Sequence, residues 1–147
     1  MSMNEPSSIE RAVGARYRLL LIIWAAQSFA LVTFFLLSLL VFGQRETGDA
    51  TLFWLLSALS VVLVIVSFII KRKYFAMAVE QQNTNHVQTG QIIAFALCEA
   101  AGLFGLTVRA VTGTPYFYLP FVVAALGLLL HFPKRETLMV ASFRNRI

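Results

Sequence analysis

The residue with the clearest chemical potential is Glu99, an acid within the apolar run 92–108. If this run crosses a bilayer, a carboxyl at its depth costs about 2.5–3.5 kcal/mol on insertion scales, so we expect it to be protonated, hydrogen-bonded or facing water. Gln27 lies at a similar depth in the first apolar run, roughly 12 Å from the start of that run. Glu99 and Gln27 are therefore our candidate ion-binding residues.

Two interpretations of Glu99 remain open. The first is a neutral acid, hydrogen-bonded to Gln27, that fixes the register of the helices. The second is a site that binds and passes a proton or another cation. Ser28 in the first run and Ser57 or Ser60 in the second could complete a small polar cluster around the carboxyl.

Other chemistry has little support in the sequence. Cys98 is the only cysteine, which excludes an internal disulfide, and its apolar surroundings predict an unreactive thiol. His86 and His131 have no cluster of acids or cysteines beside them, so we expect no metal site. No glycine-rich phosphate loop and no nucleophile paired with a base is recognisable. We expect a chain without cofactor or enzymatic activity.

Small residues follow one side of the run that carries Glu99. At ~100° per residue they form a narrow stripe with Glu99 on its margin, and such a stripe lets another helix approach closely. The approaching helix could belong to this chain, to a second copy or to another membrane protein. We expect leucine at either glycine of the stripe to disturb helix association more than leucine at Gly127. The stripe consists of Ala94, Cys98, Ala101, Gly102 and Gly105.

The elements that must position these residues can be predicted from composition. Of the 147 residues 59% are hydrophobic and 13% charged, whereas a soluble domain carries about 25% charged residues. Each of four continuous apolar runs is long enough to span ~30 Å of hydrocarbon as a helix. We expect an all-α integral membrane protein in which four transmembrane helices form an antiparallel bundle. The predicted spans are 17–42, 51–73, 88–112 and 115–132, within a transmembrane domain 17–133 flanked by tails 1–16 and 134–147.

The basic residues predict the orientation of the bundle. Ten of the twelve lie at one end of the predicted spans, and only Arg45 and Arg109 lie at the other. The positive-inside rule then places both termini in the cytoplasm. Lipid headgroups account for the net charge of +5, and no folded domain offers a basic face for nucleic acid. We expect Arg109 to extend to the outer interface.

The links between the spans also carry signals. Gly43 is suited to end the first helix and Asp49 to begin the second. Between spans three and four, Gly113 favours a left-handed cap, and the next two residues favour a helix start. Asn85 with Gln88 resembles a capping box at the start of helix three.

The C-terminal half of the chain shows two resemblances. The stretch 95–104 resembles the carboxylate-bearing helix of the c-subunit proteolipids of rotary ATP synthases, which implies reversible proton binding at Glu99. A longer stretch, 85–137, is similar to small four-span bacterial membrane proteins of uncharacterised function, which implies a bacterial inner-membrane location. The second resemblance is carried by Gln88-Thr89, Ile92-Ile93, Ala96-Leu97, Glu99, Leu103-Phe104, Thr112-Gly113 and Pro133-Lys134-Arg135-Glu136.

Overall fold

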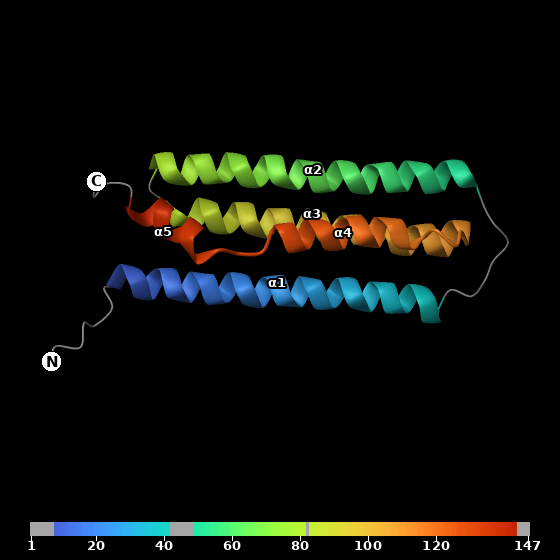
Figure 1. The fold of residues 1–147 in the computed structure, drawn as a ribbon, viewed down its shortest axis with the longest axis horizontal. Coiled ribbons are helices and arrows are strands. Elements are labelled where there is room, and N and C mark those ends of the chain that lie inside the picture. Colours follow the sequence, from blue (N-terminus) through green and yellow to red (C-terminus); the bar gives the residue numbers. More distant parts are fainter. Residues whose placement is uncertain (1–7, 42–48, 82, 144–147) are drawn as a thin grey trace.

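The computed structural model of the chain describes residues 8–41, 49–81 and 83–143, and this part is helical without strands (Figure 1). Predictions about Gly43, Arg45 and the ends of both tails concern positions outside these ranges. The elements are α1 (Ser8–Leu40), α2 (Ala50–Gln81), α3 (Thr84–Thr112), α4 (Tyr118–Leu130) and α5 (Arg135–Phe143).

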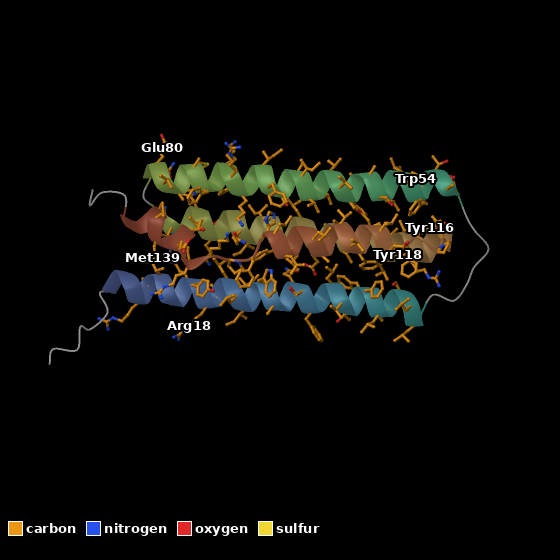
Figure 2. All side chains as sticks on the ribbon, in the orientation of Figure 1. Arg18, Trp54, Glu80, Tyr116, Tyr118 and Met139 are labelled. Carbon is orange, nitrogen blue, oxygen red and sulfur yellow. The ribbon has the colours of Figure 1, made fainter. Side chains whose placement is uncertain are left out.

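The long helices lie side by side, with α3 and α4 between α1 and α2 (Figure 1). Helix α3 is the centre of the bundle because it packs against α1, α2 and α4. The beginning of α1 and helix α5 lie at one end of the bundle, together with Arg18 and Glu80, whereas Trp54, Tyr116 and Tyr118 lie at the other (Figure 2). The described basic residues other than Arg109 thus belong to segments that meet at a single end, called the basic end below.

Three helices, α1, α2 and α3, are long and apolar enough to cross a membrane. Helix α4 has 13 residues, about 20 Å at ~1.5 Å per residue, and begins at Tyr118, three residues later than predicted. A turn precedes it, in which the Leu119 N–H donates to the Tyr116 carbonyl. Pro115 and Pro120 flank this turn and lack backbone N–H groups, which limits regular helical bonding here.

The helix ends agree with some local signals and differ from others. Gly113 ends α3 with φ 61°, the left-handed conformation that favours glycine. The Asp49 carboxylate accepts a bond from the Thr51 N–H at 2.8 Å, and this bond lowers the pKa of Asp49. At the start of α3 the cap is Asn83, whose side chain accepts from the Asn85 N–H. The predicted cap at Asn85 is two residues too late, because Asn85 is already inside the helix.

Both predicted tails contain helix. Residues 8–16 are the first turns of α1, and much of the tail after Pro133 is α5. Leu138 of α5 is 1% exposed and belongs to a hydrophobic cluster at the basic end. Helix α5 packs here because it covers apolar side chains that the long helices would otherwise expose. The other buried members of the cluster are Val13, Leu20, Ala78 and Val87.

Candidate functional site

The small-residue stripe of α3 is buried inside this chain. A side chain at Gly102 would clash with Leu31 of α1, and a Cβ at Gly105 would lie 2.6 Å from the ring of Phe121 in α4. The Ala101 carbonyl accepts a bond from the Ser60 hydroxyl of α2 at 3.3 Å. Three helices of the same chain therefore occupy the stripe. Its buried members are Ala94, Cys98, Ala101, Gly102 and Gly105.

Gly127 is also tightly packed. It is buried in α4, and a Cβ there would lie 2.9 Å from Cys98 Sγ and 3.0 Å from a methyl group of Val64. The structure does not support the expected contrast between Gly127 and the two glycines of the stripe, because Gly127 lies where α4 meets both α2 and α3.

Glu99 is half-buried on the margin of the stripe, beside the interface of α3 with α1. Gly102 faces Leu31, and Arg109 bonds to Ser38. Residues of α3 and α1 that lie side by side therefore differ by 71 in residue number. The same offset places Glu99 level with Ser28, one residue beyond Gln27.

The predicted polar cluster around Glu99 is not joined by hydrogen bonds. The Gln27 Oε1 atom is buried without a partner, as is Ser57 Oγ, and the Ser28 hydroxyl donates to the Trp24 carbonyl of its own helix. Within the described residues no hydrogen bond or ion pair involves the Glu99 carboxyl. Gln27 and Glu99 thus lie at nearly the same level along the bundle, but no hydrogen bond joins their side chains.

A different polar cluster, which we call the Ser67–His131 cluster, lies nearer the basic end. It consists of Ser67 of α2, Gln91 and Cys98 of α3, and His131, all of them buried. Ser67 Oγ lies 2.7 Å from His131 Nε2 and 3.9 Å from Cys98 Sγ. The Gln91 side-chain amide donates to the His131 carbonyl. These contacts tie together α2, α3 and the end of α4.

The hydrogen bonds assign the protons of this cluster. Ser67 has one hydroxyl proton, and its Oγ lies 2.6 Å from the Val64 carbonyl, which can only accept. His131 Nε2 must then carry a proton and donate to Ser67. The other nitrogen, Nδ1, is left as a buried acceptor without a partner. Lys71 of α2 is close enough to repel a positive charge on this ring.

The sequence predicts no role for Ser67 and Gln91 and places His131 only at a helix end. The sequence feature that could have indicated this cluster is the spacing of its residues. Ser60 and Ser67 are seven residues apart, and so are Gln91 and Cys98. Seven residues are about two helical turns, so each pair lies on one face of its helix. Those faces meet, since Ser67 contacts Cys98 and Ser60 bonds to the Ala101 carbonyl.

Arg109 contacts α1 and the turn before α4 at the opposite end of the bundle. Its Nε lies 3.4 Å from the Ser38 carbonyl, and its guanidinium carbon lies 4.8 Å from the centre of the Phe117 ring. Arg109 thus bridges the end of α1 and the turn before α4.

Known proteins offer no counterpart to these clusters. Comparison with protein-family models, curated proteins and solved structures finds no match to this chain. In the part of the chain that the structure describes, no group of three or more His, Cys, Asp or Glu side chains could hold a metal ion.

Proposed function

We propose that this chain is a non-enzymatic structural or accessory protein of a bacterial inner membrane. The observation that carries the membrane assignment is an inverted distribution of side chains. Ser60 and Ser67 are 0% exposed, whereas Phe29 is 75% exposed. Burying small and polar groups while presenting large apolar ones suits a lipid environment and would be unfavourable in water.

A four-span arrangement with both termini in the cytoplasm fits this placement. Helix α4 alone is short, but the flanking turns of the chain lengthen its path through the bundle. Collection of the basic segments at one end supports a cytoplasmic assignment for that end by the positive-inside rule.

The accessory role would use the outer surfaces of α1 and α2. The stripe of α3 is occupied by the chain's own helices, so it leaves no room for a partner. A second copy or another membrane protein would instead contact apolar side chains such as Ile22, Phe29 and Ile65, which are at least half exposed. The surrounding bilayer covers whatever such a partner leaves free.

The membrane placement predicts a definite reporter pattern. Reporters joined after Ile147 and inserted at Asn83 should both be cytoplasmic, and one inserted at Thr47 should be external. Paired phosphatase and fluorescent-protein fusions in bacteria measure this directly. An external C-terminus would contradict the four-span proposal. A cytoplasmic reporter at Thr47 would show that the first two helices do not cross the membrane as proposed.

Proton or cation binding at Glu99 is the second candidate function. It is favoured because a register-fixing acid needs a hydrogen-bond partner within the bundle, and Glu99 bonds to no described residue. The resemblance of 95–104 to proteolipid helices points the same way. A carboxyl on the margin of α3 would then be protonated in lipid or meet an ion carried by a neighbouring subunit.

Substitution of Glu99 separates the two functions. If Glu99 handles protons, a hydrophobic carbodiimide should label it faster at low pH, and Glu99→Gln should abolish proton flux in liposomes while the protein stays folded. Glu80→Gln is the control, because Glu80 is exposed at the basic end. An accessory protein should show no flux in any variant. Flux that persists in Glu99→Gln would exclude Glu99 as the site.

A further inference from the structure

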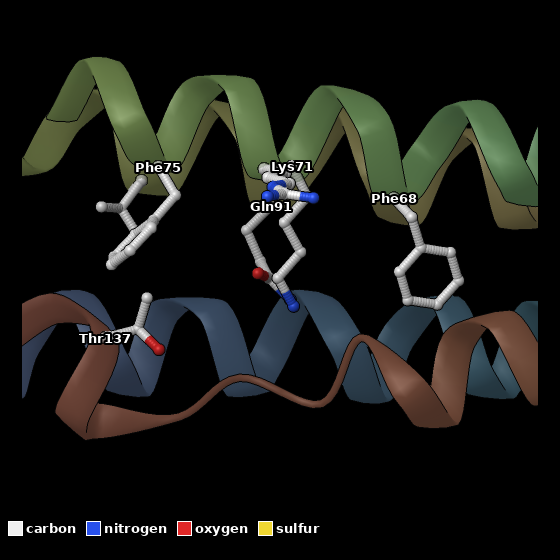
Figure 3. A pocket seen from close by; sticks show the side chains of 7 residues that line it. Phe68, Lys71, Phe75, Gln91 and Thr137 are labelled. Atoms are coloured by element: carbon white, nitrogen blue, oxygen red, sulfur yellow. The ribbon is translucent and has the colours of Figure 1, made fainter.

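An open cavity of about 510 Å³ lies at the basic end, between α2, α3 and α5. Its apolar walls are Phe68, Phe75 and Val87. Figure 3 shows the two phenylalanines on α2 at opposite sides of the opening, facing the segment that joins α4 to α5. The volume is within the range of ~300–1,000 Å³ typical of small-molecule sites.

The polar walls of this cavity are cationic. Lys71, Arg72, Gln91 and Thr137 contribute to its lining, and Figure 3 shows Lys71 and Gln91 together between the two phenylalanines. No acidic side chain among the described residues lines it. The cavity therefore presents uncompensated positive charge beside hydrogen-bonding groups, an arrangement that attracts an anion.

A second cavity, of about 180 Å³, adds to this charge. It shares Lys71, Gln91, Val87 and Thr137 with the first and is also lined by Lys134. Lys134 is close enough to Lys71 for the two charges to repel each other. A bound anion would relieve this repulsion, because each ammonium group would gain an opposite charge.

A largely exposed stripe of α2 leads from the cavity toward the middle of the bundle. Val61, Ile65, Phe68, Arg72 and Phe75 recur at intervals of three and four, so they lie on one face of the helix. Val61 and Ile65 are 43% and 54% exposed. The site therefore has a charged head and an apolar track, which a free inorganic anion would not use.

We propose that this cavity binds the phosphate headgroup of an anionic phospholipid of the cytoplasmic leaflet. Lys71 and Arg72 hold the phosphate, with Lys134 adding charge from the other side. One acyl chain lies along Phe68, Ile65 and Val61. Basic pockets between transmembrane helices on the cytoplasmic side are suited to such headgroups. The proposal rests on the membrane placement given under Proposed function.

The test compares three ligands on the full chain purified in mild detergent. Native mass spectrometry and thermal unfolding should show binding and stabilisation by phosphatidylglycerol, little of either with phosphatidylcholine, and little with inorganic phosphate. Equal stabilisation by the two lipids would overturn the proposal, since the headgroup would then not be recognised. Equal protection by inorganic phosphate would make the cavity a free-anion site and overturn the lipid assignment.

Three charge-removing variants locate the binding. A basic side chain near the membrane surface contributes about 1 kcal/mol, so Arg72→Gln and Lys71→Gln should each weaken phosphatidylglycerol binding about fivefold. Lys73→Gln is the matched control, because Lys73 is exposed and does not line either cavity. Arg72 is exposed as well, so its substitution is informative even if Lys71→Gln misfolds. An equal loss in Lys73→Gln would refute the site.

The reporter fusions keep this test distinct from the proposed membrane placement. If the reporters show another topology, the basic end does not face the cytoplasmic leaflet, and the membrane placement is wrong. A correct topology without preference for phosphatidylglycerol would overturn the lipid site alone.

Discussion

Replacing Gly90 by leucine is expected to destabilise the bundle by at least about 3 kcal/mol, more than leucine at any other glycine of the bundle. A Cβ at Gly90 of α3 would lie 2.5 Å from the Cβ of Tyr74 in α2. Tyr74 Cβ is bonded directly to the α2 backbone, so no side-chain rotation can remove the clash. The two helices would have to separate. Unfolding of the purified protein in detergent, followed by circular dichroism, measures the loss.

Other glycines provide a graded comparison. Gly102→Leu should cost less than Gly90→Leu, since its clash is with the end of the Leu31 side chain, which can rotate. Gly105→Leu should be intermediate because the Phe121 ring is held in the core. Gly14 is the control: a Cβ there would have no neighbour within 4 Å. If Gly14→Leu and Gly90→Leu unfold at the same denaturant concentration, the close approach of α2 and α3 is wrong.

Sequence reasoning was most successful for the helices themselves. Continuous apolar runs leave a helix as the simplest way to satisfy the backbone in lipid, so α1, α2 and α3 were predictable. The small residues of α3 also marked it as a helix that others approach closely. The sequence left open which helices approach it, because α1 and α2 are apolar on all sides, so hydropathy does not mark the face that each of them buries.

The remaining differences arise from contacts between segments distant in sequence. Residues 134–147 are predicted as a tail, yet Leu138 of α5 is buried in a cluster with side chains of α1, α2 and α3. The Ser67–His131 pair depends on how α2 and the end of α4 are rotated, which helical periodicity alone does not determine. Glu99 drew attention by its residue type, whereas the polar groups that bond to one another lie toward the basic end.

His131 provides the second large effect. His131→Ala is expected to cost about 3 kcal/mol, because it removes a ring that is fully buried and leaves a cavity beside Phe68. His86→Ala is the control and should change stability by less than about 0.5 kcal/mol. The His86 side chain is at the same end of the bundle, only partly buried, and hydrogen-bonded to the exposed Gln81.

His131→Phe then tests whether the ring acts through packing or through hydrogen bonding. Phenylalanine keeps most of the ring volume and loses the bond to Ser67, which is worth about 1 kcal/mol. It also removes Nδ1, a buried acceptor without a partner. Removing an unsatisfied buried group increases stability, and this increase should offset part of the stability lost with the bond to Ser67. We therefore expect His131→Phe to unfold much closer to wild type than His131→Ala. If both variants lose the same stability, the bond to Ser67 dominates, and the Ser67–His131 cluster holds α2 to α4 by its polar contacts.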